Sequence, residues 1–198
     1  MKRSTSMLMA IALLFCVGQA NASLVITFAQ SGADVVATGI GSLNFLDLSF
    51  QGFDFNNSYV NAGAGAVMLG SSGTYADFYG NISGPTTFGS GVNVFANSST
   101  STAPNSTGAG VFGSTGQILV PGGYFAGNPF TVSATWNNTT ISGLGLTPGT
   151  YVWTWGSANA DNLTVIVPGS AVPEPSSLIL LGSGTLGLIG VVRRKILG

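Results

Sequence analysis

The sequence contains no histidine, and its single cysteine is Cys16, close to the N-terminus. Neither a Ser-His-Asp triad nor a Cys-His pair can therefore form, and residues 23–171 can build neither a disulfide framework nor a zinc–thiolate site. Lysine and arginine are confined to the two ends, so the chain lacks positive side chains everywhere between Arg3 and Arg193. Because nothing there can neutralise phosphates, we expect no nucleic-acid partner.

The N-terminal segment 1–22 has the pattern of a secretory signal peptide. Lys2 and Arg3 precede an apolar run over residues 7–17, and Ala20-Asn21-Ala22 before Ser23 forms a small-x-small cleavage site. Cys16 also suggests a lipoprotein, although the bulky Phe15 before it fits a lipobox badly. The sequence thus predicts an exported chain that is cut between Ala22 and Ser23.

Residues 172–198 carry a second targeting pattern. Pro173-Glu174-Pro175 disfavours a helix, the uncharged run 178–192 favours one, and Arg193-Arg194-Lys195 ends it with three cations. Fifteen helical residues span roughly 22 Å, which is short for a hydrocarbon core of about 30 Å, and a buried core helix is the alternative. Because the run is apolar all round, we predict a transmembrane helix over about 177–192, with the cations on the cytoplasmic side.

These residues resemble the PEP-CTERM sorting domain, a tail that is also described as an ice-binding protein C-terminal domain. The resemblance implies export in a Gram-negative bacterium, recognition of Pro173-Glu174-Pro175 by an exosortase, and removal of the helix. It also implies a mature protein at the cell surface or in the exopolysaccharide of the extracellular matrix. Ice binding would need a regular threonine array, and pairs such as Thr100 and Thr102 form no repeat.

Residues 23–171 are expected to form one all-β domain, a β-sandwich or a jelly-roll-like fold. Residues 24–28 and 34–38 are β-branched runs that predict a hairpin, and residues 43–50 continue in extended style with a bulge near Phe45-Leu46. Residues 97–110 are rich in Ser, Thr and Asn, which predicts a long surface loop. Short strands separated by glycine-rich turns are typical of sandwiches.

The end of this domain has the clearest pattern. Thr147-Pro148-Gly149-Thr150 fits a type II turn, and Leu163 to Val167 follows as a strand that pairs antiparallel with the one before it. The preceding strand alternates and places three large aromatics, Tyr151, Trp153 and Trp155, on one face. We favour a core role for this face, because a small domain without disulfides needs their burial, and a sugar-binding face is the alternative.

Three segments of the domain resemble a group of exported bacterial PEP-CTERM proteins. They are Asp34 to Gly39, Ile82 to Pro85, and Leu146 to Gly156. This resemblance covers most of the chain but implies no activity, because the group is largely uncharacterised.

Calcium is the one metal that the composition suggests. Aspartates with nearby asparagines supply the hard oxygen ligands that Ca²⁺ prefers, but no loop has the Asp-x-Asp-x-Asp-Gly spacing. We therefore expect solvated loop carboxylates and no resident cofactor. The candidates are Asp47, Asp54, Asp77 and Asp161.

Taken together, the sequence predicts an exported, non-enzymatic surface protein that is sorted through its C-terminal motif. A carbohydrate-binding module of the extracellular matrix is the alternative. A glycoside hydrolase would need two carboxylates that face each other across a cleft, and no spacing of the aspartates fixes such a pair.

Overall fold

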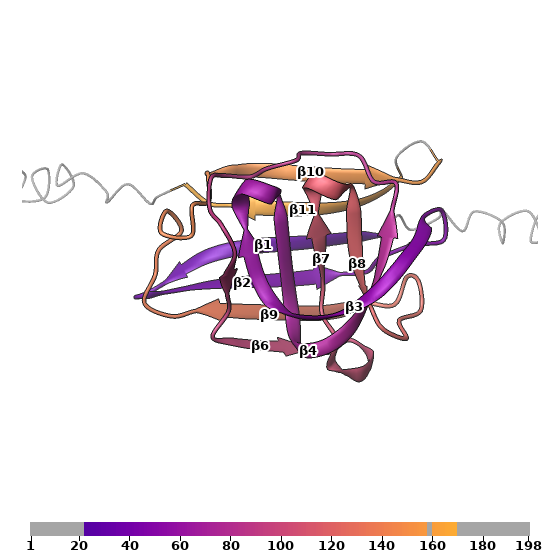
Figure 1. Ribbon diagram of the computed structural model, residues 1–198, viewed down its shortest axis with the longest axis horizontal. Coiled ribbons are helices and arrows are strands. Elements are labelled where there is room, and N and C mark those ends of the chain that lie inside the picture. Colours follow the sequence, from indigo (N-terminus) through magenta and orange to yellow (C-terminus); the bar gives the residue numbers. More distant parts are fainter. Residues whose placement is uncertain (1–21, 158–159, 170–198) are drawn as a thin grey trace, which may run out of the picture. The chain divides into compact units, whose positions relative to one another are not determined.

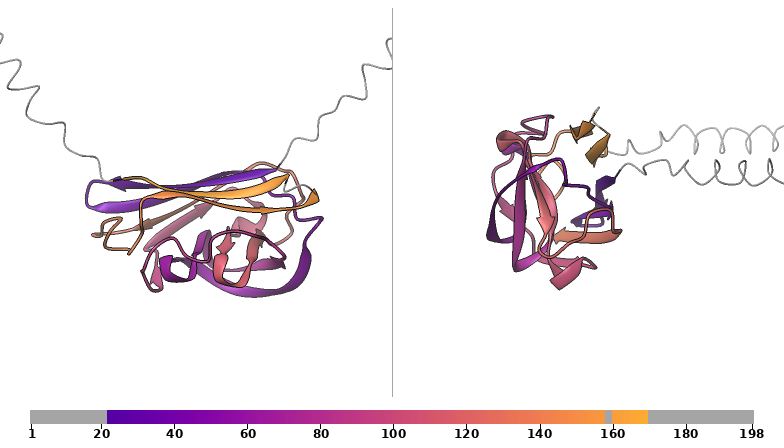
Figure 2. Two further views of the ribbon diagram at one scale, coloured as in Figure 1. Left: turned by 90° about the horizontal axis from the view of Figure 1, so that it is seen from above. Right: turned by 90° about the vertical axis from the view of Figure 1, so that its right-hand side faces the viewer.

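The computed structural model describes residues 22–157 and 160–169, which form two stacked β-sheets (Figures 1 and 2). The chain divides into two compact units, Met1–Pro168 and Gly169–Gly198, and every named strand belongs to the first. The expected apolar run of the signal peptide, the sorting motif and the C-terminal helix fall outside the described residues. The expected all-β sandwich is confirmed.

The first sheet has six strands in the order β10-β11-β1-β2-β9-β6. Its centre pairs the first strand of the domain with the last: β1 runs parallel to β11 and antiparallel to β2. This parallel pair departs from the fully antiparallel pattern of a jelly roll. The strand bounds are β1 Ser23–Ser31, β2 Asp34–Gly41, β6 Ser98–Ser101, β9 Phe130–Trp136, β10 Gly149–Trp155 and β11 Asp161–Val167.

The second sheet has five strands in the order β5-β3-β4-β7-β8. The long strand β4 pairs with β7 near its start and with β8 near its end, so β8 contacts both β4 and β7. Short 3-10 turns connect several strands. The bounds are β3 Ser49–Asn61, β4 Ala66–Gly80, β5 Val94–Phe95, β7 Ala109–Phe112 and β8 Gln117–Pro121, with η2 Ala62–Ala64, η3 Pro104–Ser106 and η4 Gly113–Thr115.

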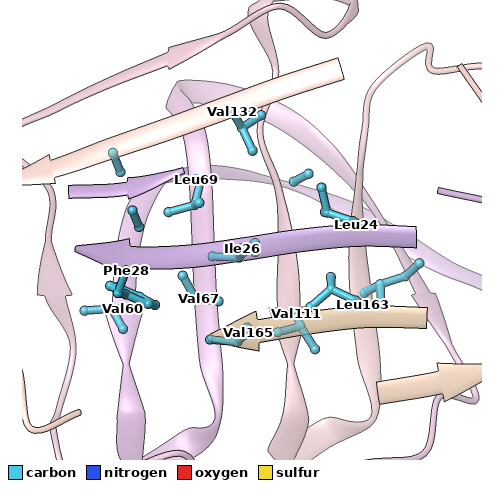
Figure 3. Packing of buried hydrophobic residues seen from close by; sticks show 14 of the residues in the cluster. Leu24, Ile26, Phe28, Val60, Val67, Leu69, Val111, Val132, Leu163 and Val165 are labelled. Atoms are coloured by element: carbon cyan, nitrogen blue, oxygen red, sulfur yellow. The ribbon is translucent and has the colours of Figure 1, made fainter. Parts of the chain in front are cut away.

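The core lies between the sheets and follows from alternation along the strands. In β1, Leu24, Ile26 and Phe28 are fully buried, whereas the residues between them face away. They meet residues such as Val67 and Val111 of the second sheet (Figure 3). Because each β-branched or aromatic side chain on these faces leaves water, burial replaces the cross-links that this domain lacks.

The predicted hairpins are confirmed. β1 and β2 pair from Leu24 with Gly41 to Ser31 with Asp34, and Gly32 takes the left-handed φ of +62° that the tight turn requires. β10 and β11 also pair antiparallel, as predicted.

Three local predictions are wrong. The segment 97–110 is not a long loop but contains β6, η3 and the start of β7. Its polar residues form the strand β6 because the edge of β9 supplies hydrogen-bond partners. No type II turn forms at 147–150: Gly149 opens β10, and the nearby left-handed glycine is Gly145, with φ +69°. Instead of an extended segment with a bulge, residues 45–48 form a turn in which Leu48 N–H donates to Phe45 O (3.0 Å).

Within the described part of the chain, no helix has the length and apolar character needed to cross a membrane.

Candidate functional site

The aromatic face of β10 belongs to the core. Trp153 and Trp155 are buried, and their Nε1–H groups donate to Pro85 O (2.9 Å) and Asn44 O (2.6 Å). Tyr151 is partly exposed, and its hydroxyl donates to Thr147 O (3.0 Å). Because both indoles are enclosed and hydrogen-bonded to the backbone, they stabilise the fold. The alternative, in which they form a sugar-binding face, is wrong for these two residues.

Of the four aspartates considered for calcium, the structure brings together Asp47 and Asp161. One carboxylate oxygen of each lies 3.2 Å from the position that a Cβ would take on Gly156. Asp161 is buried, and it accepts hydrogen bonds from the Ala22 amide (3.1 Å) and from Asn44 Nδ2 (3.0 Å). Backbone and amide donors thus satisfy this carboxylate without a metal.

Asp54 and Asp77 lie elsewhere, on the β3–β4 hairpin. In the register of this hairpin, Asp54 is opposite Ala76 and Asp77 is opposite Phe53. Asp54 accepts a hydrogen bond from the Phe55 N–H (2.7 Å). Among the described residues, no three acidic, histidine or cysteine side chains gather as a metal site would require. The four aspartates therefore form no common calcium site.

The same hairpin carries the most unusual surface feature of the domain, an exposed group of aromatic rings. We call it the aromatic strip and define it as Phe50, Phe53, Phe55 and Tyr75. Their side chains are 56, 65, 54 and 48% exposed. Aromatic side chains normally bury most of their area, so four half-open rings on neighbouring positions are a candidate binding surface.

The register of the hairpin explains why these rings share one face. Phe55 is opposite Tyr75, Phe53 is opposite Asp77, and Phe50 is opposite Tyr79. A register shift between Phe50 and Gly52 inserts one extra residue, which returns Phe50 to the face of Phe53 despite their odd separation. Ring contacts agree, since Tyr75 lies 5.5 Å from Phe53 and 3.6 Å from Phe55 between centroids.

The aromatic strip continues the side of the second sheet that faces the core. Tyr79 packs against the main core, and its ring lies 4.7 Å from Phe45 and 5.6 Å from Phe50. The rings of the strip lie on this same side of the hairpin, but they are about half exposed, beginning with Phe50 directly opposite Tyr79. Figure 2 shows the long curved path of β3.

Asp77 is the charged group of this surface. Burial among the neighbouring side chains raises the pKa of the Asp77 carboxyl above its ordinary value. Burial, and secondly the Asp77 charge, raise the pKa of Tyr79. A carboxylate beside exposed rings can accept hydrogen bonds from hydroxyl groups, while the rings offer apolar faces.

The outer face of the same sheet is also apolar, but its central residues are covered by neighbouring side chains of that face. Met68 and Leu119 are fully buried there, beneath partly buried rings that include Tyr59 and Phe112. Burial raises the pKa of the Tyr59 hydroxyl to about 12. This second cluster is closed by its own side chains, whereas the aromatic strip is open.

The sequence interpretation did not identify the aromatic strip. The signal was present, because Phe53 and Phe55 alternate around Asp54 in a segment that also contains Phe50. Alternation shows that side chains share a face, but it does not show whether a second sheet covers that face.

The comparisons with known proteins concern the C-terminal tail. Residues 171–195 match the family model described as the PEP-CTERM protein-sorting motif. This match covers Pro173, Glu174 and Pro175 together with Arg193, Arg194 and Lys195, all of which lie outside the described residues. No curated protein and no solved structure gives a significant match to the chain.

The chain is thus a protein with a PEP-CTERM sorting domain, as its tail predicted. The motif supports export, sorting to the envelope or surface, and an exosortase as the processing partner. It carries no information on the activity of the β-sandwich.

Proposed function

We propose that this chain is a non-catalytic protein of the cell surface or extracellular matrix, whose β-sandwich is delivered by its C-terminal tail. The observation that carries the proposal is the match of residues 171–195 to the sorting motif. In this scheme the apolar run 178–192 holds the exported chain in the membrane, and Arg193-Arg194-Lys195 keeps its end on the cytoplasmic side. An exosortase then cuts beside Pro173-Glu174-Pro175 and releases the domain from its helix.

The composition supports a non-catalytic role. Residues 23–171 contain neither histidine nor cysteine, so the commonest bases and nucleophiles of hydrolases are absent from the sequence. The only titratable side chains there are five aspartates and the tyrosines. This argues for binding or assembly as the task of the domain.

The C-terminus of the native surface protein tests the proposal. Mass spectrometry of protein recovered from the native host should show a chain that ends near residues 173–175. In a Glu174→Ala variant the chain should instead extend through Gly198, while a Ser170→Ala control should be processed as usual. An unprocessed wild-type chain would contradict removal of the tail.

A second candidate function, carbohydrate binding, is favoured by the aromatic strip. Phe53, Phe55 and Tyr75 present half-exposed rings on one face, and Asp77 lies among them. Pyranose rings have apolar C–H faces that stack on aromatic side chains, and their hydroxyls donate to carboxylates. Because the domain has no cationic side chain, it is better suited to a neutral glycan than to an acidic one.

Affinity electrophoresis in gels that contain a neutral glucan or an acidic alginate tests this function. We expect the neutral polymer to retard the protein and the acidic polymer to leave its migration unchanged. Phe53→Ser and Tyr75→Ser should each abolish the retardation. Phe125→Ser is the matched control, since Phe125 is 74% exposed but lies outside the strip. Equal migration of the wild type in both gels and in a blank gel would contradict the proposal.

A further inference from the structure

The first described residue, Ala22, is an integrated part of the β-sandwich. Its side chain is only 4% exposed. Its N–H donates to the buried Asp161 Oδ1 (3.1 Å), and its carbonyl accepts from the Asn162 N–H (3.2 Å). These contacts extend the parallel pairing of β1 with β11 by one residue before Ser23.

Cleavage between Ala22 and Ser23, as the small-x-small pattern predicts, would remove all of these contacts. Asn162 N–H would lose its acceptor, and Asp161 would retain only the hydrogen bond from Asn44. A buried polar group without its partner is costly, and here both groups belong to the strand next to the centre of the sheet. Cleavage at the predicted position would therefore cost the mature fold the contacts of Ala22.

A second position in the sequence satisfies the same cleavage rule. Gly18-Gln19-Ala20 also places small residues at the third and first positions before the cut. Cleavage there leaves Asn21 and Ala22 on the mature chain. Every contact of Ala22 is then retained.

We propose that the export leader is removed between Ala20 and Asn21, so that the mature protein begins at Asn21. This inference rests on the proposed export of the chain. Hydrolysis of the peptide bond consumes one water, leaves a carboxylate on Ala20 and creates an α-ammonium group on Asn21.

The surroundings of Ala22 agree with this position. Its N–H donates to the buried carboxylate of Asp161, and between Arg3 and Arg193 no side chain is positive. Cleavage after Ala20 preserves this hydrogen bond, and the positive charge that it creates is one residue along the chain from the Ala22 nitrogen.

The N-terminus of the exported full chain tests the proposal directly. N-terminal sequencing and intact mass of protein from the native host should identify Asn21 as the first residue. A chain that begins at Ser23 would overturn this inference and leave the export proposal intact. A surface protein that begins at Met1 would overturn removal of the leader, whereas a chain found only in the cytoplasm would overturn the export proposal itself.

Two substitutions separate the cleavage positions without relying on a folded product. Gly18→Leu places a bulky residue at the third position before the Ala20 cut and should make the uncleaved precursor accumulate. Ala22→Gln blocks a cut after Ala22 but should leave processing at Asn21 unchanged. Accumulation of precursor with Ala22→Gln, or normal processing of Gly18→Leu to Ser23, would contradict the proposal.

A stability comparison tests the physical reason. Two otherwise identical chains that begin at Asn21 or at Ser23 differ in the Ala22 contacts, and the shorter one should melt about 5 °C lower. Equal melting temperatures would show that the Ala22 contacts do not decide where the mature chain begins.

Discussion

The six-stranded sheet and the β3–β4 hairpin are built from similar residues but in contrasting ways. In the sheet, strands β9 and β11 alternate without a break between buried and half-buried positions. In the hairpin, the pairing shifts at three places, and Gly52, Gly70 and Gly73 have positive φ. Regular pairing gives a face that a second layer can cover completely, whereas the irregular hairpin leaves the aromatic strip outside that cover.

This contrast separates stability from candidate function within one domain. The two tryptophans of β10, Trp153 and Trp155, are enclosed and their indole N–H groups are hydrogen-bonded, so their removal should mainly affect folding. The three phenylalanines of the aromatic strip in β3 stay half exposed, so their removal should mainly affect binding.

The largest difference in stability is expected between the Trp153→Ala and Phe53→Ala variants. The first empties a fully buried site and breaks the hydrogen bond to Pro85 O, which should lower the free energy of unfolding by about 3–5 kcal/mol. The second removes a ring that is 65% exposed and should change stability by no more than about 0.5 kcal/mol. Urea unfolding followed by circular dichroism measures both values. Similar losses for the two variants would show that the strip is part of the core.

Gly70→Ala and Gly73→Ala test whether the irregular β3–β4 hairpin is nonetheless closely packed against the first sheet. Both glycines have left-handed φ, +78° and +69°, so both variants carry the same backbone cost of about 1–2 kcal/mol. At Gly70 the new Cβ would also lie 2.7 Å from a methyl carbon of Val132, whereas at Gly73 the nearest atom is 3.8 Å away. Thermal unfolding should therefore show a further loss of roughly 1–3 kcal/mol for Gly70→Ala alone. Equal losses would mean that the two sheets can separate locally at this point.

Asp77→Asn should have the smallest effect on stability, and this effect should grow as the pH rises. Burial raises the pKa of Asp77, so the folded state binds its proton more tightly than the unfolded state does. The wild type therefore loses stability as pH rises from about 4 through this raised pKa, and the asparagine variant does not. At pH 7 the variant should be more stable by at most about 0.5 kcal/mol, because solvent screens the partly exposed carboxylate.

Unfolding titrations of both proteins between pH 3 and pH 7, a range chosen around the ordinary aspartate pKa, measure this difference. A difference that grows toward acid would contradict the assigned cause. A constant difference would assign the effect to packing instead of charge.

The sequence predicted most of the six-stranded sheet. Strands are identified by the short β-branched runs around Gly32 and by the alternation of Tyr151, Trp153 and Trp155. Such strands form once a neighbouring strand supplies hydrogen-bond partners. The core interpretation of the two indoles followed from the same need for buried area. These inferences succeed because local pattern and tertiary structure agree.

The failures arise where the tertiary structure overrides the local pattern. Ser98 to Ser101 has the composition of a loop, yet it forms β6 because the edge of β9 supplies hydrogen-bond partners. Pro148-Gly149 has the sequence of a type II turn, yet Gly149 is needed as the first residue of β10. The exposure of the aromatic strip depends on which surfaces other parts of the fold cover, and the meeting of Asp47 with Asp161 joins segments far apart in the sequence. No local pattern contains either kind of information.

The parallel pairing of β1 with β11 also determines when the domain can become complete. Ala22 and Asp161 are neighbours although 139 positions separate them in the chain. During synthesis or passage through a membrane channel, the first strand therefore keeps one open edge until the last strand has emerged. High separation between partners slows folding, because a long loop must close before the contact stabilises it. The first sheet can therefore be completed only after residue 167 is free.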